Sequence, residues 1–485
     1  MRFRLSRAHL VALLVMVFAG ALRLRGLGTD SLRTDEIFII ARSGGSFEQL
    51  LGRIGETVMG APVEFLLRHA VLSVTHDDYF LRLPDALLGT LSVYVLYLLA
   101  SRLFDPTTGL TASVLLAVSG LHLFHSTDAR YYSLYCLLSL TSTLFLLRAR
   151  DSGRLWEWTA FCASMIVGFY TCYFMAFVAL VHALFMLGPS CFSGKWRERA
   201  PGRGAFLLSG VAIALLVAPW LLLYRPVPNI PYGPTPLTTA LRRMSSGFSG
   251  GRGWIEAVHV GLFAAALVLT RKQDRSPVAL CLLFVVIPFP IIVWLDNRFL
   301  YFFGARQMIF ALPFFLTLVA YGMVRASARL VSSVGRPHWR QPALVALVTL
   351  CVASSAAEQR TAQAQGQEDW RGAARYLLDR MRPGDVLAVS YLPAGPPDGD
   401  NVSYYLTTLG PQFYPHRIVN IALSKPGELE EIAREARVWV LIASRTFFAT
   451  KRPQFFAEME RSFEKEASFP GGFIYQQIQI YRSRN

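Results

Sequence analysis

Long apolar stretches recur along the first three quarters of the chain and constrain its fold more than any other feature. Each is roughly 17–22 residues long, enough for a helix to cross about 30 Å of hydrocarbon. Only 16% of the 485 residues are charged, against roughly a quarter in soluble domains. The pattern predicts an α-helical polytopic membrane protein of about 11 transmembrane helices. We place the spans at 8–26, 85–104, 109–126, 131–148, 156–172, 174–190, 204–223, 254–270, 277–295, 307–325 and 342–357.

The composition changes near residue 358, which predicts two domains, a transmembrane domain over 1–357 and a soluble domain over 358–485. Short β-rich runs alternate with helical patterns in the second domain, which is typical of a small α/β fold. Strands are predicted at Val386–Ser390, Arg417–Ile421, Val438–Ala443 and Phe473–Tyr481. Helices are predicted at Asp369–Arg382, Pro426–Ala436 and Pro453–Phe463.

The net charge of +16 comes largely from arginines between the apolar spans and not from a basic soluble domain. This distribution argues against a nucleic-acid partner. The connections that begin at Arg2, Arg102, Arg148, Lys195 and Arg271 alternate along the chain, and the positive-inside rule makes them cytoplasmic. The N-terminus is then cytoplasmic and the C-terminal domain periplasmic or extracytoplasmic, in a multi-pass protein of the cell inner membrane.

Two of the loops on the outer side are long. The first outer loop, at about 27–84, contains amphipathic stretches, Ser46–Ile54 and Pro62–Val74, that suit helices along the membrane interface. Residues 224–253 are rich in proline and glycine. This composition suits either a mobile lid or a turn-rich connector.

Two adjacent acidic residues, Asp35 and Glu36, follow the first span and precede an apolar run. They lie close to the membrane surface, where a lipid-borne substrate presents its head group. One interpretation is a general base with an orienting or metal-binding partner. The other is a solvated loop acid or a cap for the following helix. Position alone does not decide between the two.

Arginines mark the outer ends of several other spans. Arg82 opens the second span, Arg130 stands between the third and fourth, and Arg306 opens the tenth. Guanidinium groups bind phosphate in a bidentate manner and stay charged near a membrane. Together with an acidic pair they would form a phosphate-holding pocket that also carries a base. The alternative is that each arginine extends to lipid head groups at its helix end.

A pair of histidines, His122 and His125, lies one helical turn apart near the end of the third span. Such spacing presents two imidazoles to a metal ion. No third ligand is evident, and Asp128 is ambiguous, so a core or interfacial role is the favoured interpretation. The six cysteines form no CxxC pair and indicate no disulfide framework.

The region from Thr34 to about Leu187 resembles the polyprenyl-phosphate-sugar-dependent glycosyltransferases of the GT-C class. The resemblance is to the family 39-like branch, which is related to protein O-mannosyltransferases and lipid A aminoarabinose transferases. It covers about a third of the chain and lies in the order of its motifs, which is more specific than any one of them. These are Asp35-Glu36, Gly60–His69, Arg82–Gly89, Ser126–Tyr132 and Tyr170–Phe174.

Some positions depart from the family pattern. Gly60 and Ala61 replace the usual histidine and proline, Cys172 replaces a histidine, and Arg306 is followed by Gln307 instead of tyrosine. These departures affect the expected metal binding and the details of the substrate pocket more than the class of reaction.

The resemblance implies a GT-C type bundle and an inverting transfer, with Asp35 as general base and Glu36 as an orienting group or a possible ligand of a divalent metal ion. Arg130 and Arg306, then Arg82, are the expected ligands of the donor phosphate. Tyr132, Tyr173 and Pro62 are expected in the substrate pocket. The donor would be a polyprenyl-phosphate-linked sugar, and the acceptor hydroxyl would belong to a glycan, a lipid or a protein.

Two other classes stay open. A transporter or flippase of lipid-linked saccharides would show inverted repeats and ionisable residues at mid-membrane, and the sequence has no evident repeat and few such charges. An inactive scaffold member of the same fold would keep the motif order without the chemistry. An oligosaccharyltransferase is a closer relative in function, but the tail has no Trp-Trp-Asp sequence.

Overall fold

The structure is a computed structural model of the whole chain. It describes residues 6–56, 62–188, 202–223, 234–299, 303–333, 339, 341–353, 368–389, 401–410, 417–420, 427–443, 453–472 and 476–484. The chain divides into two compact units. The first comprises Met1–Arg25, Phe47–Leu66 and Arg82–Arg360; the second comprises Gly26–Ser46, Leu67–Leu81 and Thr361–Asn485. The second unit thus combines C-terminal residues with two segments of the first predicted outer loop.

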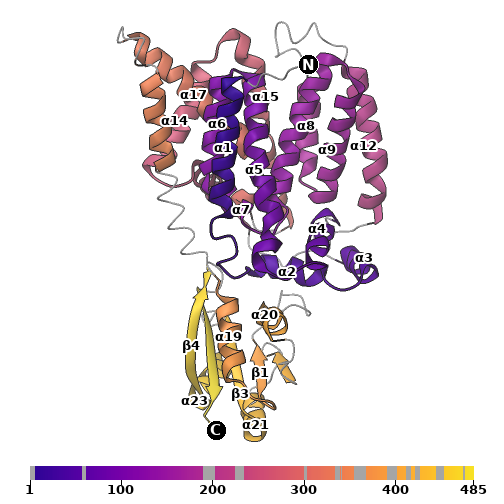
Figure 1. Cartoon of the computed structure of the whole chain (residues 1–485), viewed down its shortest axis with the longest axis vertical. Coiled ribbons are helices and arrows are strands. Elements are labelled where there is room, and N and C mark those ends of the chain that lie inside the picture. The colour runs from indigo at the N-terminus through magenta and orange to yellow at the C-terminus, as the bar shows by residue number, and fades with distance from the viewer. Residues whose placement is uncertain are drawn as a thin grey trace. The chain divides into compact units, whose positions relative to one another are not determined.

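The first unit is a helical bundle whose longer members run side by side (Figure 1). Its longer members are α1 (Arg7–Leu24), α5 (Asp78–Leu103, whose first turn belongs to the second unit), α8 (Tyr132–Ser152), α9 (Leu155–Thr171), α12 (Arg203–Leu223) and α17 (Leu312–Ser333). Its shorter ones are α3 (Phe47–Glu56), α6 (Pro106–Val118), α7 (Gly120–Ser126), α10 (Met175–Leu187), α13 (Leu237–Ser249), α14 (Trp254–Val268), α15 (Arg275–Val286) and α16 (Pro288–Phe299).

The bundle confirms the prediction of a polytopic helical membrane protein. Within the described residues, six helices are long and apolar enough to cross a membrane, and the bent pair α6 and α7 would make a seventh. This is fewer than the predicted number of about 11, because several predicted spans form shorter apolar helices, such as α10, α14 and Gln341–Ala353. The predicted span 109–126 is broken by a bend of 60° between α6 and α7.

Helix α17 packs against α6, α14 and α15. Its contact with α14 is so close that a Cβ atom on Gly322 would collide with the carbonyl oxygen of Leu262. Helices in membranes associate through close packing at small residues, because lipid tails are as apolar as the side chains themselves. Gly322 therefore sets the distance between α14 and α17.

The second unit contains a five-stranded sheet in the order β2-β1-β3-β5-β4. Parallel pairing joins β1 to β2 and to β3, while β5 runs antiparallel to β3 and β4. The strands are β1 (Val386–Val389), β2 (Arg417–Asn420), β3 (Val438–Ala443), β4 (Phe463–Gly471) and β5 (Gln476–Ser483). Helix α19 (Trp370–Arg380) precedes β1, and the helices between the strands are α20 (Asn401–Leu409), α21 (Glu428–Glu435) and α23 (Pro453–Ser462).

This sheet confirms the predicted small α/β fold. Strand β4 and helix α20 were absent from the prediction. Strand β4 has mostly exposed or partly exposed residues along its length and lies at the edge of the sheet, so it lacks the apolar pattern by which a strand is recognised. The predicted domain boundary at 357/358 lies outside the described residues.

The long outer loops contain more helix than their composition indicates. The amphipathic stretches Ser46–Ile54 and Pro62–Val74 form α3 and α4 (Pro62–Leu72). In the loop 224–253, residues 224–233 lie outside the described residues, and Leu237–Ser249 forms α13 and not the predicted series of turns. Apolar residues at helical spacing stabilise α13, and Gly250 ends it with a φ of 73°.

Candidate functional site

The two predicted catalytic carboxylates lie in the first turn of α2 (Thr34–Ser43). The Arg33 backbone N–H donates to Oε2 of Glu36 at 2.8 Å, so Glu36 caps the start of its own helix. Glu36 is fully buried, whereas Asp35 is half-buried. The two carboxylates therefore have different environments: Glu36 faces inward as a cap, and Asp35 keeps a surface that a substrate could reach.

A third carboxylate, Glu368, lies beside this turn and was not predicted from the sequence. Its Oε2 accepts hydrogen bonds from the backbone N–H and the hydroxyl of Thr34, at 2.9 and 2.7 Å, and from the Trp370 indole at 2.7 Å. Burial raises the pKa of Glu368; the bonds from Trp370 and Thr34 oppose this rise, and the negative charge of Asp35 adds to it. Glu368 is thus bound to the residue that precedes Asp35.

The loop that leads into α2 has two further attachments to the C-terminal residues. The Arg371 guanidinium donates to the Gly28 carbonyl from both Nη atoms at 3.2 Å. The Tyr405 hydroxyl donates to Oδ2 of Asp78 at 2.7 Å and accepts from the Leu32 N–H at 2.6 Å. All of these residues belong to the second unit. The loop before the acidic pair is therefore fixed by residues more than 300 positions later in the chain.

In the first unit, Arg130 forms a buried ion pair with Glu64. Its Nε lies 3.0 Å from Oε1 of Glu64, and the two side chains are 11% and 3% exposed. The same oxygen accepts the backbone N–H of Tyr131 at 3.2 Å. Glu64 lies in the first turn of α4, just after Pro62, whose fixed φ suits the first position of a helix. The pair fixes the guanidinium of Arg130, and Glu64 was given no role in the sequence analysis.

Aromatic side chains surround this ion pair. The Arg130 guanidinium lies 5.7 Å from the Tyr131 ring centroid and 5.9 Å from that of Tyr132, at distances typical of cation–π contacts. The His125 ring packs on Tyr132 with a centroid separation of 4.4 Å, and its Nδ1 lies 3.5 Å from Asp128. Tyr132, a predicted pocket residue, is therefore in direct contact with the predicted phosphate ligand Arg130.

The histidine pair has partners other than a metal ion. Nδ1 of His122 lies 2.7 Å from Nη2 of the fully buried Arg23, while His125 faces Tyr132 and Asp128. Among the residues that the structure describes, no group of three or more histidine, cysteine or acidic side chains is arranged to hold a metal ion. The favoured interpretation of the two histidines, as core residues, agrees with these contacts.

The other predicted residues lie at separate places in the first unit. Arg82 is 2% exposed in α5. Arg306 lies in the short 3₁₀ helix η3 (Ala305–Met308), which packs against α7 and α13. Tyr173 is half-buried between α9 and α10. These three side chains and Arg130 belong to the first unit, whereas Asp35 and Glu36 belong to the second.

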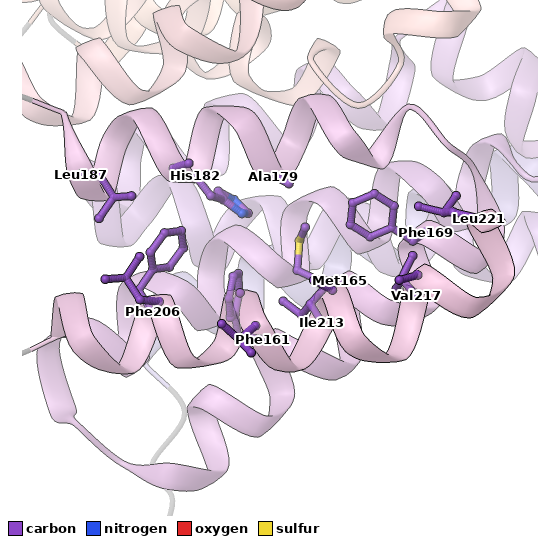
Figure 2. A pocket seen from close by; sticks show the side chains of 16 residues that line it. Phe161, Met165, Phe169, Ala179, His182, Leu187, Phe206, Ile213, Val217 and Leu221 are labelled. Atoms are coloured by element: carbon purple, nitrogen blue, oxygen red, sulfur yellow. The ribbon is translucent and has the colours of Figure 1, made fainter.

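An apolar cavity of about 610 Å³ opens among α9, α10 and α12 (Figure 2). Phe161, Met165 and Phe169 line it from α9, and Phe206 and Val217 line it from α12. Its walls are almost wholly hydrocarbon and aromatic, and such walls suit an apolar chain and not a sugar or a phosphate.

The comparisons with known proteins agree with this fold. Residues 60–223 match the family model described as dolichyl-phosphate-mannose-protein mannosyltransferase. The match includes Pro62, Glu64, Arg82, Arg130, Tyr132 and Tyr173. No curated protein sequence matches the chain.

Solved structures share the fold over nearly the whole chain. ArnT from Cupriavidus metallidurans in the apo state has a TM-score of 0.58 at 12% identity, with 98% of each chain covered. The same protein bound to undecaprenyl phosphate has a TM-score of 0.56 at 12% identity, with 97% of each chain covered. The oligosaccharyltransferase of Archaeoglobus fulgidus has a TM-score of 0.55 at 11% identity, covering 97% of this chain and 74% of its own.

These similarities confirm the resemblance that the sequence motifs indicated. The chain is a polytopic helical membrane protein with the fold of ArnT and of the archaeal oligosaccharyltransferase. Its residues 60–223 are similar to the mannosyltransferase family.

Proposed function

We propose that the protein transfers a sugar from a polyprenyl-phosphate-linked donor to an acceptor hydroxyl at the outer face of the membrane, with inversion at the anomeric carbon. The observation that carries this proposal is the difference between the two carboxylates of α2. Glu36 is used as a helix cap, and the half-buried Asp35 is held beside it in the same turn. A general base needs to reach the proton that it removes, and the partial exposure of Asp35 supports this assignment.

The transfer balances without an added reagent. Asp35 takes the proton of the acceptor hydroxyl as its oxygen forms a bond to the anomeric carbon. The bond from that carbon to the phosphate oxygen breaks, and the polyprenyl phosphate leaves with the electron pair. The attack and the departure occur on opposite faces of the sugar, which inverts the anomeric configuration.

The negative charge that grows on the leaving phosphate is assigned to arginines. Fixed positive groups aimed at developing charge stabilise a transition state without having to reorganise. Arg130 is fixed in this way by Glu64, which supports it as the first ligand of the phosphate, with Arg306 and Arg82 as further ligands. Tyr132, Tyr173 and Pro62 are assigned to the walls of the substrate pocket.

The isoprenoid part of the donor needs an apolar environment. The cavity among α9, α10 and α12 has walls of that kind, and ArnT, whose fold is similar, has been solved with undecaprenyl phosphate. Both observations support a lipid-linked donor. In this proposal the N-terminus is cytoplasmic, the C-terminal residues are extracytoplasmic, and the base acts on the face of the membrane opposite the cytoplasm. A nucleotide sugar does not suit this arrangement, because it would be on the cytoplasmic face.

A divalent metal ion has no clear place in this mechanism. The described residues include no group of three possible ligands, and the Glu36 carboxylate is buried and accepts the Arg33 N–H. The described residues therefore offer no set of ligands for a metal ion, and every step is assigned to a side chain of this protein.

Transfer assays with purified protein test the proposal. Wild type and Asp35→Asn are given radiolabelled polyprenyl-phosphate sugars together with glycan, lipid and hydroxyl-bearing peptide acceptors. Loss of the base should lower kcat by about 10²–10⁴-fold, with little change in the KM for the donor. Glu48→Gln, which neutralises an exposed acid of α3, should keep wild-type activity.

Two results would contradict the proposal. Equal transfer by wild type and Asp35→Asn would remove Asp35 as the base. Absence of transfer from every lipid donor, together with saturable transport of a lipid-linked saccharide into vesicles, would assign the protein to the transporters instead.

A further inference from the structure

Residues 368–371, which begin the described part of the C-terminal segment, lie against the loop that enters α2. Glu368 accepts two hydrogen bonds from Thr34, and its backbone carbonyl accepts the Ser31 hydroxyl. Arg371 donates to the Thr29 carbonyl at 2.5 Å. Every residue named here belongs to the second unit. The segment therefore contacts the loop at several successive positions before the acidic pair.

The contact of Glu368 with Thr34 requires one oxygen atom to accept several hydrogen bonds. Three donors, the Thr34 N–H, the Thr34 hydroxyl and the Trp370 indole N–H, converge on a single oxygen of Glu368 at 2.7–2.9 Å. Satisfying all of them takes an acceptor oxygen at the distance from the backbone that the Glu368 side chain provides. Glu368 is 6% exposed, so water does not readily replace it as an acceptor.

We propose that Glu368 is a positioning residue for Asp35, so that the C-terminal segment sets the catalytic geometry of the base. This inference rests on the function proposed above. Thr34 is joined directly to Asp35, and both lie in the first turn of α2. Because Glu368 holds both donor groups of Thr34, it fixes the direction in which this turn presents the Asp35 carboxylate.

The size of the expected effect follows from the geometry that a general base requires. A misplacement of about 1 Å at a reacting group costs on the order of 100-fold in rate. Glu368→Ala removes the acceptor for all three donors, and we expect kcat to fall by about 100-fold with the donor KM unchanged within about threefold. Glu368→Gln keeps a carbonyl oxygen at the same distance, so it should recover most of the lost activity.

A matched control separates positioning from the stability of the C-terminal segment. Asp369 is the next residue, and its side chain caps α19 by accepting the Gly372 N–H at 2.8 Å. Asp369→Ala should destabilise the same segment, since it removes the N-cap of α19, yet leave kcat within about twofold of wild type. A structural role alone would lower activity equally in Asp369→Ala and Glu368→Ala.

A double-mutant cycle tests the path through Thr34. Thr34→Val keeps the shape of the side chain and removes the hydroxyl that donates to Glu368. It should lower kcat in the wild-type background and have no further effect in Glu368→Ala, because the two changes remove the same interaction. Additive losses in the double variant would overturn the inference.

Hydrogen exchange measured by mass spectrometry gives a result that does not depend on activity. In the full-length protein, backbone amides 28–36 should exchange at least tenfold faster in Glu368→Ala than in wild type, and at the wild-type rate in Asp369→Ala. Unchanged protection would overturn the inference whether or not the protein transfers a sugar. Wild-type kcat in Glu368→Ala, with a fully active wild type, would overturn it while leaving the proposed function intact.

Discussion

The acidic segment, Thr34 to Glu36, and the arginine cluster, which is Arg130 with Glu64, Tyr131 and Tyr132, are held in place by different kinds of interaction. Arg130 is fixed by an ion pair with Glu64, buried among the helices of the bundle and surrounded by aromatic rings. The turn that carries Asp35 is fixed by hydrogen bonds that Thr34 donates to Glu368, and the loop before it by the bond that the Leu32 N–H donates to Tyr405. The position of Arg130 depends on an ion pair in an apolar environment. The position of the Asp35 turn depends on hydrogen bonds between donors and acceptors within the second unit.

This difference has consequences for how each region responds to change. A buried ion pair is costly to break from one side, because the remaining charge stays in an environment that solvates it poorly. Loss of one hydrogen bond from a set lowers the free energy of unfolding by a smaller amount, since each bond contributes little to it. The loss is larger only where a buried group is left unsatisfied. The arginine cluster should therefore fail as a whole, and the acidic segment should loosen gradually.

The largest effect on stability is expected at Glu64. Glu64→Ala leaves Arg130 buried without its partner, and removal of one member of a buried pair costs about 3–5 kcal/mol. The free energy of unfolding in detergent, measured by denaturant titration, should fall by this amount. Transfer activity should fall with it, because the guanidinium loses the contact that orients it.

The double variant Glu64→Ala with Arg130→Ala sharpens this prediction. Removal of both charges should restore part of the free energy of unfolding, while activity stays low because the proposed phosphate ligand is missing. A double variant no more stable than Glu64→Ala would show that the ion pair does not govern the stability of this region.

The next effect concerns Tyr405 in the second unit. Tyr405→Phe removes one hydroxyl that donates to Asp78 and accepts from the Leu32 N–H. An unsatisfied buried group costs about 1–3 kcal/mol, and the opening free energy of amide 32, measured by hydrogen exchange, should fall within that range. Tyr404→Phe is the matched control, because the bonds to Leu32 and Asp78 belong to Tyr405. Equal effects of the two substitutions would contradict the prediction.

Much of the first unit could be predicted from the sequence because its physics is local. Apolar runs of membrane length become helices, since a backbone in lipid must satisfy its own hydrogen bonds, and α8 and α12 follow the predicted spans closely. The break between α6 and α7 was not predictable, because both halves have the same apolar composition. Arg130 stood out as a charge between two apolar spans, whereas Glu64 gave no such signal within a polar loop.

In the second unit, one strand and the contacts around Asp35 were not predicted from the sequence. The strands β1, β2 and β3 have apolar β-branched runs and were predicted. Strand β4 was not predicted, because its residues are largely polar. Asp35 was identified from its motif. Its contact network was not, because Glu368 lies 334 residues after Thr34 and only the folded chain brings them together. The proximity of two carboxylates across such a distance leaves no pattern in the sequence.

The smallest predicted effect is a dependence of stability on pH at Glu368. Burial raises the pKa of this carboxyl above its ordinary value of 4.5, so between the two values the folded state binds more protons than the unfolded state. The free energy of unfolding should then fall as the pH rises from 4.5 through the folded pKa, by at most about 1.4 kcal/mol per pH unit for one proton. The stabilisation is complete below 4.5 and absent above the folded pKa.

Glu368→Gln isolates this contribution, because its side chain keeps an acceptor oxygen and does not titrate. The opening free energy of the second unit, measured by hydrogen exchange between pH 4.5 and 8, should be flatter in Glu368→Gln than in wild type. Parallel profiles would mean that the three hydrogen bonds from Thr34 and Trp370 offset the cost of burial, so that the Glu368 carboxyl has the same pKa in the folded and unfolded states, and they would contradict the prediction.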